Sequence, residues 1–196
     1  MTAQQILLSS DEELARQARA GSVASFDELA RRVQIPLIGF LERRFPSRQD
    51  AEDITQETLI RAYQSLARYQ DHRRFRTWVF TIAYRIAVSR GRSERPAIEM
   101  ADDFPDLREN AHESMDRRES SQRIWAVANA VLTEDQVTAL WFYYVEDLPA
   151  GDIARVMGRS WVSVKTMLHR ARKKLHPHLA AEYAPNMMSA PAGESR

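Results

Sequence analysis

The hydrophobic positions of this chain follow a helical period along most of its length. A C-terminal segment shows the pattern most fully, with apolar residues at i, i+4, i+7 and i+11: Val164, Leu168, Ala171 and Leu175. Residues at that spacing share one face of a helix. No clear strand pattern appears, so we predict an all-α fold. The predicted helices span residues 11–20, 24–45, 48–69, 75–92, 118–131, 134–145, 150–157 and 161–176.

Helix-start and helix-stop signals fit these boundaries. Ser10 and Thr133 are each followed three residues later by Glu13 or Gln136, the spacing of a capping box. Gly158 fits a tight turn between the last two helices. Within that pair we expect Asp147 and Ser160 as caps and Pro149 in a first turn.

Composition divides the chain into two units. The segment 96–117 is acidic, contains proline and lacks periodicity, so it predicts a flexible linker. It separates a helical domain at 8–95 from a second one at 118–180, whose end forms a helix-turn-helix. Residues 181–196 are rich in Pro, Ser and Ala, and we expect a disordered tail there.

The overall composition excludes several classes of protein. With 44% hydrophobic residues the chain can bury a core, and with no Cys it cannot form disulfides or Cys-ligated zinc sites. It has no apolar run of membrane-spanning length and no secretory start, so we expect a cytoplasmic protein without membrane insertion. The net charge of +1 averages over separated basic and acidic blocks.

The first segment with functional chemistry is an acidic ridge near the start of the helix 48–69. Asp50, Asp53 and Glu57 fall at i, i+3 and i+7, with Gln56 beside them. Acidic residues near a helix N-terminus are commonly a solvated face that the helix dipole stabilises. The alternative is a docking surface for a basic partner helix. Spacing alone leaves both interpretations open.

The second segment, 72–95, combines arginines with aromatic residues. Phe75, Val79, Ile82 and Ile86 form its buried stripe, and we expect Trp78 to be buried as well. Cations that follow a phosphate chain and rings on which bases stack are typical of single-strand binding. The candidate surface aromatics are Tyr69, Phe80 and Tyr84, and the candidate cations are Arg73, Arg74, Arg76, Arg85, Arg90 and Arg92.

The third segment is the helix-turn-helix at 148–175. Its second helix is apolar on one side and carries basic and hydrogen-bonding groups on the other, which suits the DNA major groove. The candidate base-reading and phosphate-binding residues are Ser163, Lys165, Thr166, His169, Arg170 and Lys173. A generic helical hairpin with a basic face is the alternative.

The residues that would indicate catalysis are few. The chain has five His, none at a spacing that pairs it with a carboxylate, and it has no glycine-rich phosphate loop and no nucleophile motif. We therefore expect no enzymatic activity, no catalytic residue, no small-molecule substrate, no cofactor and no metal site.

Taken together and in this order, the three segments resemble the bacterial sigma-70 family, specifically its extracytoplasmic-function sigma factors. DAEDITQETLIRAY is similar to the family's region 2.2, FRTWVFTIAYRIA to regions 2.3 and 2.4, and LPAGDIARVMGRSWVSVKTMLHRARKKL to region 4.2. The resemblance covers about 11–95 and 118–178. It implies a two-domain initiation subunit that binds core RNA polymerase, recognises the −35 and −10 promoter elements and helps to open the duplex.

The resemblance also implies roles for the three segments. Asp53, Gln56 and Glu57 match the D-x-x-Q-E of region 2.2 and would, together with Asp50, dock on the polymerase β′ subunit. The arginine and aromatic segment, beginning at Tyr69, would hold the non-template strand at −10. The helix-turn-helix would read −35, and the acidic linker would lie along the polymerase. Contact with the β subunit and an anti-sigma partner are further implications of the family.

Three positions depart from the family pattern. Arg85 stands where the family usually has Asn, Ser89 where Asp is frequent, and Val162 where a small residue is frequent. The Asn belongs to a pocket for a flipped −10 base, and Arg offers donors only. The departures leave the core-binding residues untouched.

Two other functions fit parts of the pattern. A stand-alone helix-turn-helix regulator with an N-terminal dimerisation domain would bind a palindromic duplex without polymerase. A helical adaptor would use its basic faces to bind an acidic protein. Neither accounts for an acidic ridge together with an arginine and aromatic segment, so a cytoplasmic, nucleoid-associated sigma factor is the favoured prediction.

Overall fold

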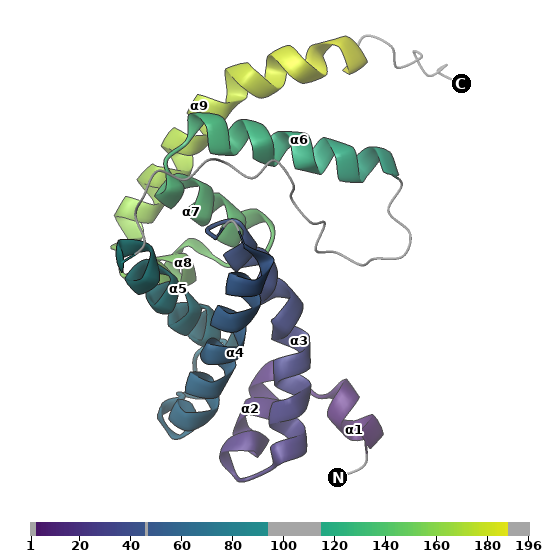
Figure 1. Ribbon diagram of the computed structural model, residues 1–196, viewed down its shortest axis with the longest axis vertical. Coiled ribbons are helices and arrows are strands. Elements are labelled where there is room, and N and C mark those ends of the chain that lie inside the picture. Colours follow the sequence, from purple (N-terminus) through teal and green to yellow (C-terminus); the bar gives the residue numbers. More distant parts are fainter. Residues whose placement is uncertain (1–2, 46, 94–114, 188–196) are drawn as a thin grey trace, which may run out of the picture.

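The computed structural model describes residues 3–45, 47–93 and 115–187, and the side chains of 4–45, 47–91 and 123–179. Every regular element in these ranges is helical, as predicted (Figure 1). The first group of helices forms an N-terminal unit: α1 (Ala3–Leu8), α2 (Asp11–Arg19), α3 (Val23–Glu42), α4 (Arg48–Ser65), the 3-10 turn η1 (Leu66–Arg68) and α5 (Phe75–Ser93). The second group forms a C-terminal unit: α6 (Met115–Val131), α7 (Glu134–Tyr144), α8 (Ala150–Met157) and α9 (Trp161–Met187).

The caps explain where several helices begin. The Thr133 hydroxyl accepts from the Gln136 amide at 3.4 Å, and the Gln136 side chain accepts from the Thr133 amide at 3.1 Å, which confirms that capping box. Ser10 accepts from the Glu13 amide at 3.1 Å. These side chains satisfy amides that have no partner within the helix.

Three boundaries differ from the prediction. Helix α1 was not predicted, because its six residues AQQILL are too few to show a clear helical period. Helix α6 begins at Met115, inside the predicted linker, and the rest of that linker lies outside the described residues. Helix α9 continues past Pro177 to Met187, although proline removes one backbone donor. The predicted tail is therefore helical at 181–187, and 188–196 are not described.

The N-terminal unit packs α2, α4 and α5 around the central helix α3. The apolar face of α4 is buried, from Ala51 and Ile54 to Ala62. Phe75, Val79 and Ile86 of α5 are also buried, while Ile82 and Trp78 are half-buried at its edge. Burying such side chains is the main favourable contribution to folding.

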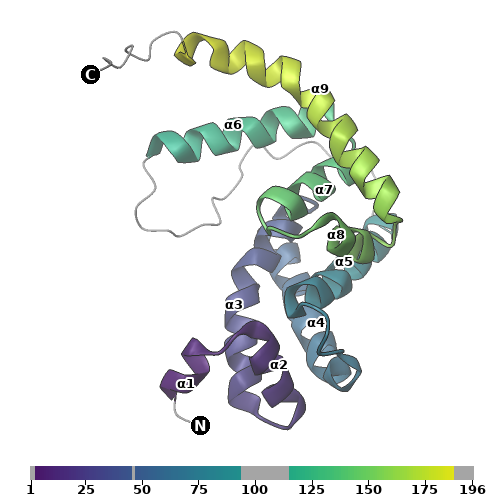
Figure 2. The same cartoon turned by 180° about the vertical axis from the view of Figure 1, so that it is seen from behind.

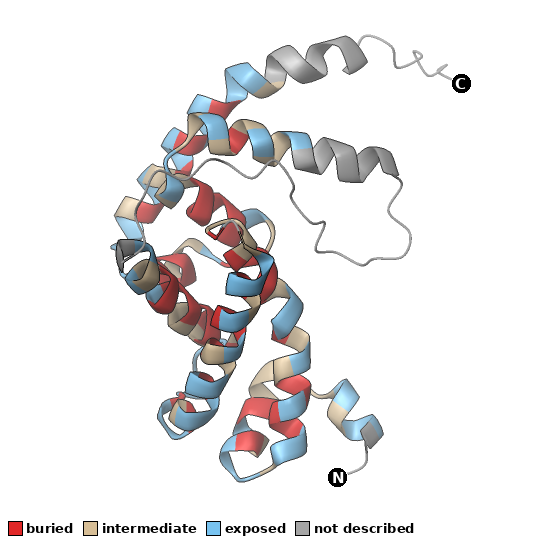
Figure 3. Cartoon of the chain, in the orientation of Figure 1, coloured by how far each residue is buried: buried red, intermediate tan, exposed pale blue. Residues whose placement is uncertain are grey.

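The two units share one core. Helix α5 packs against α8, and the buried residues form a single cluster that continues from one unit into the other. Figure 2 shows the same cartoon from behind, with α6 and α9 at the far end from α1 and α2. Figure 3 shows buried residues gathered where α3, α5, α7 and α8 meet.

None of the described helices is long and apolar enough to cross a membrane. No group of three or more His, Cys, Asp or Glu in the described part of the chain could hold a metal ion.

Candidate nucleic-acid interface

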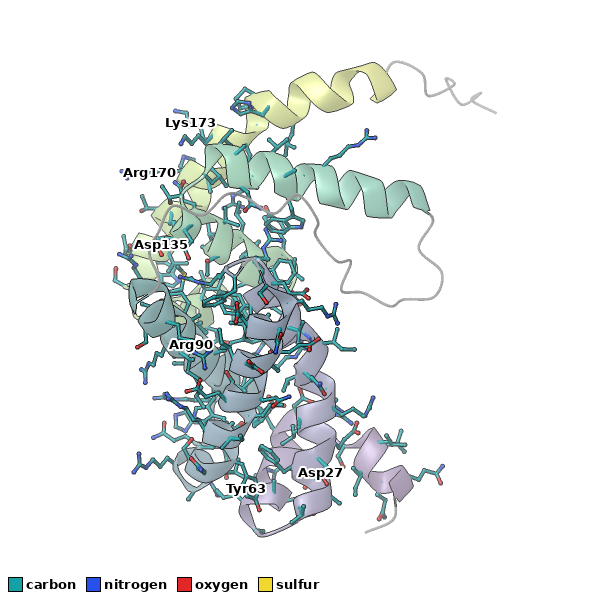
Figure 4. All side chains as sticks on the ribbon, in the orientation of Figure 1. Asp27, Tyr63, Arg90, Asp135, Arg170 and Lys173 are labelled. Atoms are coloured by element: carbon teal, nitrogen blue, oxygen red, sulfur yellow. The ribbon has the colours of Figure 1, made fainter. Side chains whose placement is uncertain are left out.

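The second helix of the helix-turn-helix has the two faces that the sequence predicts. Its apolar positions are buried: Val164, Leu168, Ala171 and Leu175. On the other side Lys165, Thr166, His169, Arg170 and Lys173 are exposed, and Ser163 is half-buried. Figure 4 shows Arg170 and Lys173 at the outer edge of α9. One face thus fixes the helix in the unit and the other offers cations and hydrogen-bonding groups.

The turn before this helix depends on a glycine. Gly158 ends α8 with φ of 63°, in the left-handed region that favours glycine, and its amide donates back to α8. The Ser160 hydroxyl then accepts from the Ser163 amide at 3.2 Å, the predicted cap. Asp147 does not act as a cap: it has φ of 50° in the preceding turn, and Pro149 is the residue before α8. Aspartate tolerates that conformation better than most residues.

The N-terminal end of α9 carries an exposed aromatic residue next to its first cation. Trp161 is 54% and Val162 65% exposed. The Lys165 ammonium lies 4.4 Å from the centroid of the Trp161 ring, within cation–π distance. Sequence reasoning missed this pair, although i, i+4 spacing predicts that such side chains meet.

The loop that precedes α5 is held in place by the core beneath it. Tyr69 is 1% exposed; its ring contacts Phe75 and Trp78, and its hydroxyl donates to the Arg73 carbonyl. Burial, followed by nearby carboxylates, raises the pKa of the Tyr69 hydroxyl to about 12. Arg19 of α2 donates to the Tyr69 carbonyl at 3.0 Å. We predicted a surface ring at Tyr69, and that prediction was wrong because three aromatic rings pack together here.

The other two candidate surface aromatics are also buried. Phe80 has no exposed surface, and Tyr84 is 9% exposed. Phe80 packs edge-to-face on Phe40 and Phe142, and burial raises the pKa of Tyr84. The rings that cover Phe80 come from α3 and from α7, which sequence periodicity within α5 cannot show. Trp78, which we expected to be buried, is half-buried.

The candidate −10 arginines divide into exposed and paired groups. Arg73, Arg74 and Arg85 are exposed, and Arg74 also lies within ion-pair distance of Asp152, at 3.9 Å. Arg76 forms an ion pair with Glu146 at 3.2 Å, and Arg90 forms one with Glu57 at 2.7 Å. Arg92 lies outside the residues whose side chains are described.

The acidic ridge is present on α4, and one of its members, Glu57, forms ion pairs. Asp50, Asp53 and Gln56 are exposed. Glu57 is half-buried and pairs with Arg61 at 2.6 Å as well as with Arg90 of α5. Glu57 and Arg90 were predicted to lie in different sites, one for polymerase and one for DNA, and the structure brings them together across the α4–α5 contact.

An apolar cavity of about 660 Å³ lies between α6, α7 and α9. Trp125, Leu140, Tyr144 and Leu179 contribute to its walls, with Arg172 and His176 among its polar lining residues. The sequence does not indicate this cavity, because its lining residues come from three helices that are distant along the chain.

Comparison with known proteins places these units in one family. The family descriptions "Sigma-70 region 2" and "Sigma-70, region 4" match residues 29–96 and 128–175. The RNA polymerase sigma-H factor of Pseudomonas aeruginosa is 30% identical over 177 residues, which cover 84% of this chain and 91% of the relative. The ECF RNA polymerase sigma-E factor of Haemophilus influenzae is 30% identical over 176 residues, which cover 84% and 93%.

Two solved structures share the fold. CnrH in complex with the cytosolic domain of CnrY matches with a TM-score of 0.65 at 22% identity, over 88% of this chain and 99% of that one. The sigma factor RpoE in complex with the anti-sigma factor NepR from Bartonella quintana matches with a TM-score of 0.58 at 23% identity, over 80% and 98%.

Both sigma regions match in the predicted order, and the relatives extend over most of the chain. A stand-alone regulator with a separate dimerisation domain is therefore not favoured. The chain belongs to the extracytoplasmic-function group of the sigma-70 family and is an RNA polymerase sigma factor.

Proposed function

We propose that this sigma factor divides its work among three surfaces: α4 for core polymerase, the loop before α5 with α5 itself for the −10 strand, and α9 for the −35 duplex. The observation that carries the proposal is the two-faced recognition helix, whose apolar positions are buried while its cations face solvent. A helix fixed in this way presents its polar face to the major groove.

For the −35 element we assign Ser163, Lys165, Thr166, His169, Arg170 and Lys173. Replacing Lys165 and Arg170 by Ala should weaken duplex binding by the holoenzyme and lower the slope of log affinity against log salt by about one for each lost phosphate contact. Lys174→Ala is the matched control, because its ammonium donates to the Val131 carbonyl on the side facing α6. If Lys174→Ala changed duplex affinity and salt dependence as much as the Lys165 and Arg170 replacements, the −35 assignment would be wrong.

For the −10 strand we assign the exposed cations Arg73, Arg74 and Arg85, with Arg76, Arg90 and Arg92 as further contacts. Tyr69 and Tyr84, being buried, serve by positioning rather than by stacking. Ala at Arg73 and Arg74 together should reduce promoter opening by the holoenzyme, measured with a fluorescent base analogue at −10, while duplex binding at −35 persists. Unchanged opening would contradict the role.

For core polymerase we assign Asp50, Asp53, Gln56 and Glu57, which would meet a basic surface of the β′ subunit. Asp53→Ala should weaken binding to core, measured by fluorescence anisotropy, more than Asp27→Ala does. Asp27 is an exposed carboxylate on α3 of the same unit and is therefore a control for net charge. Equal affinity of the two variants would exclude the ridge as the docking surface.

An anti-sigma protein is a further expected partner, since the sigma factor RpoE, which shares this fold, has been solved in complex with the anti-sigma factor NepR. Co-purification of the full chain with a candidate anti-sigma domain, followed by loss of core binding, would test this partner.

A further inference from the structure

The loop between η1 and α5 presents its side chains to solvent from a backbone that is held at both ends. Residues 70–74, which we name the −10 loop, are all exposed and include Arg73 and Arg74. On either side lie the buried rings of Tyr69 and Phe75, each 1% exposed. A loop loses less entropy on binding when it is already held in its bound conformation. The contacts that hold this backbone therefore affect how well the loop binds the −10 strand.

The start of α5 lacks a capping side chain at its own N-cap position. The Arg74 carbonyl accepts from the Trp78 amide at 3.2 Å, which makes Arg74 the N-cap residue of α5. That position usually carries Ser, Thr, Asp or Asn, whose side-chain oxygen accepts from a free amide in the first turn. The guanidinium of arginine offers donors only. An acceptor for the first turn of α5 must therefore come from elsewhere.

Glu12 of α2 supplies that acceptor. Its Oε1 atom accepts from the Phe75 amide at 3.3 Å, although the two residues are 63 positions apart. Phe75 is the first residue of α5, so its amide has no partner within the helix. The positive end of the helix dipole also favours a carboxylate at this place. Glu12 therefore does for α5 what an N-cap side chain usually does from within the helix.

The other carboxylates in the first turn of α2 have different partners. Asp11 accepts from Arg32 of α3 at 3.0 Å. Glu13 pairs with Arg16 of α2 itself. Glu12 thus contacts α5, while its neighbours stabilise α2 and its contact with α3. A change at Glu13 therefore removes the same charge from the same turn without removing the contact with α5.

A second side chain of α2 holds the opposite end of the loop. Arg19 donates to the Tyr69 carbonyl at 3.0 Å and to the Asp71 carboxylate at 3.0 Å. The ion pair is partly exposed and contributes little by itself, whereas the bond to the carbonyl fixes the backbone. Arg19 follows Glu12 by seven residues, so both lie on one face of α2. This helix packs against η1 and α5, on either side of the loop.

We propose that α2 is a clamp for the −10 loop, in which Glu12 caps α5 and Arg19 holds the backbone at the start of the loop. Both are positioning residues, since they act on the backbone from which Arg73 and Arg74 extend. Because the cap comes from Glu12, position 74 can carry an arginine in place of a capping residue. The proposal rests on the −10 role proposed above, but the clamp itself is tested without DNA.

Amide hydrogen exchange in the free full-length chain, measured by NMR, tests the clamp. In Glu12→Ala the Phe75 amide should exchange roughly tenfold faster than in wild type, the effect of one hydrogen bond to a charged group. Glu12→Gln should retain most of the protection, because its amide oxygen still accepts. Glu13→Ala is the matched control and should leave the exchange of Phe75 unchanged. Equal exchange of Phe75 in wild type and Glu12→Ala would overturn the proposal.

Promoter opening by the holoenzyme, followed with a fluorescent base analogue at −10, measures the functional effect. Glu12→Ala should reduce opening roughly fivefold, because the loop must then be ordered on binding, and Arg19→Ala should reduce it less. Affinity for core polymerase and for the −35 duplex should stay at the wild-type value, and Glu12→Gln should restore most of the opening. Arg16→Ala, at an exposed cation of α2, is the control for Arg19→Ala. Opening at the wild-type level in Glu12→Ala would overturn the proposal.

A general loss of stability could also reduce opening, and Glu28→Gln separates the two causes. Glu28 pairs with arginines of its own helix, α3, so this variant should destabilise the N-terminal unit while opening and the exchange of Phe75 stay near wild type. A loss of opening in Glu28→Gln equal to that in Glu12→Ala would overturn the positioning role. If Ala at both Arg73 and Arg74 leaves opening unchanged, the −10 assignment fails, and the exchange of Phe75 still decides whether α2 holds the loop.

Discussion

Glu28 shows how much a single residue can organise in this fold. It is 8% exposed and accepts from Arg31 at 2.8 Å and from Arg32 at 2.7 Å. Arg32 also donates to Asp11 at 3.0 Å and to the Leu7 carbonyl at 2.9 Å, which connects α3 to α2 and to the end of α1. The hydrogen bonds from Arg31 and Arg32 lower the pKa of Glu28 to about 2.

The lowered pKa predicts a pH-dependent contribution to stability. Because the folded pKa of about 2 lies below the reference value of 4.5, the contribution is full above about pH 4.5 and is lost as the pH falls toward 2. Glu28→Gln should lower the free energy of unfolding by about 1–3 kcal/mol at pH 7, measured by urea denaturation. The difference from wild type should shrink at pH 3. A difference that is constant with pH would contradict the assignment.

Tyr69 is a second residue whose role the core decides. Tyr69→Phe keeps the ring contacts with Phe75 and Trp78 but removes the hydroxyl that donates to the Arg73 carbonyl. We expect a loss of about 1 kcal/mol in the free energy of unfolding and reduced promoter opening by the holoenzyme. Tyr63→Phe, at an exposed position, is the control. Promoter opening equal to wild type would show that the hydroxyl does not position the loop.

At the scale of elements, replacing either of two glycines in the helix-turn-helix by Ala should change the stability in opposite directions. Gly158 has φ of 63°, and a Cβ there would meet no atom within 4 Å, so Gly158→Ala costs only backbone strain. We expect Gly158→Ala to lower the free energy of unfolding by about 1 kcal/mol. Gly151 lies inside α8, and a Cβ there would also meet no atom within 4 Å. Gly151→Ala should therefore raise the free energy of unfolding by roughly a few tenths of a kcal/mol. Thermal denaturation of both variants measures the two effects, and a stabilising Gly158→Ala would refute the turn argument.

At the scale of the whole molecule, the continuous core predicts joint unfolding. We expect wild type to show one thermal transition by circular dichroism, because Phe142 and its neighbours couple the two units. Phe142→Ala should divide the melt into two transitions, the first at lower temperature, since loss of a buried aromatic residue costs about 3–5 kcal/mol. Two transitions already present in wild type would show that the units unfold independently.

The sequence determined the local features of this protein. The helices, their caps at Ser10, Thr133 and Ser160, and the buried face of α9 follow from periodicity and from hydrogen-bonding groups a few residues apart. The solvated face of the recognition helix follows from the same period. These features depend on neighbours in the chain, so a linear pattern contains them.

Only the tertiary structure decided which of these groups are available to partners. Tyr69 and Tyr84 are aromatic residues beside arginines in the sequence, but packing buries both. Glu57 pairs with Arg90 across two helices, and Glu146 pairs with Arg76 across two units. Such pairs join residues 33 and 70 positions apart. Helical periodicity covers only neighbouring turns, so the burial and charge neutralisation of distant groups depend on how the helices pack.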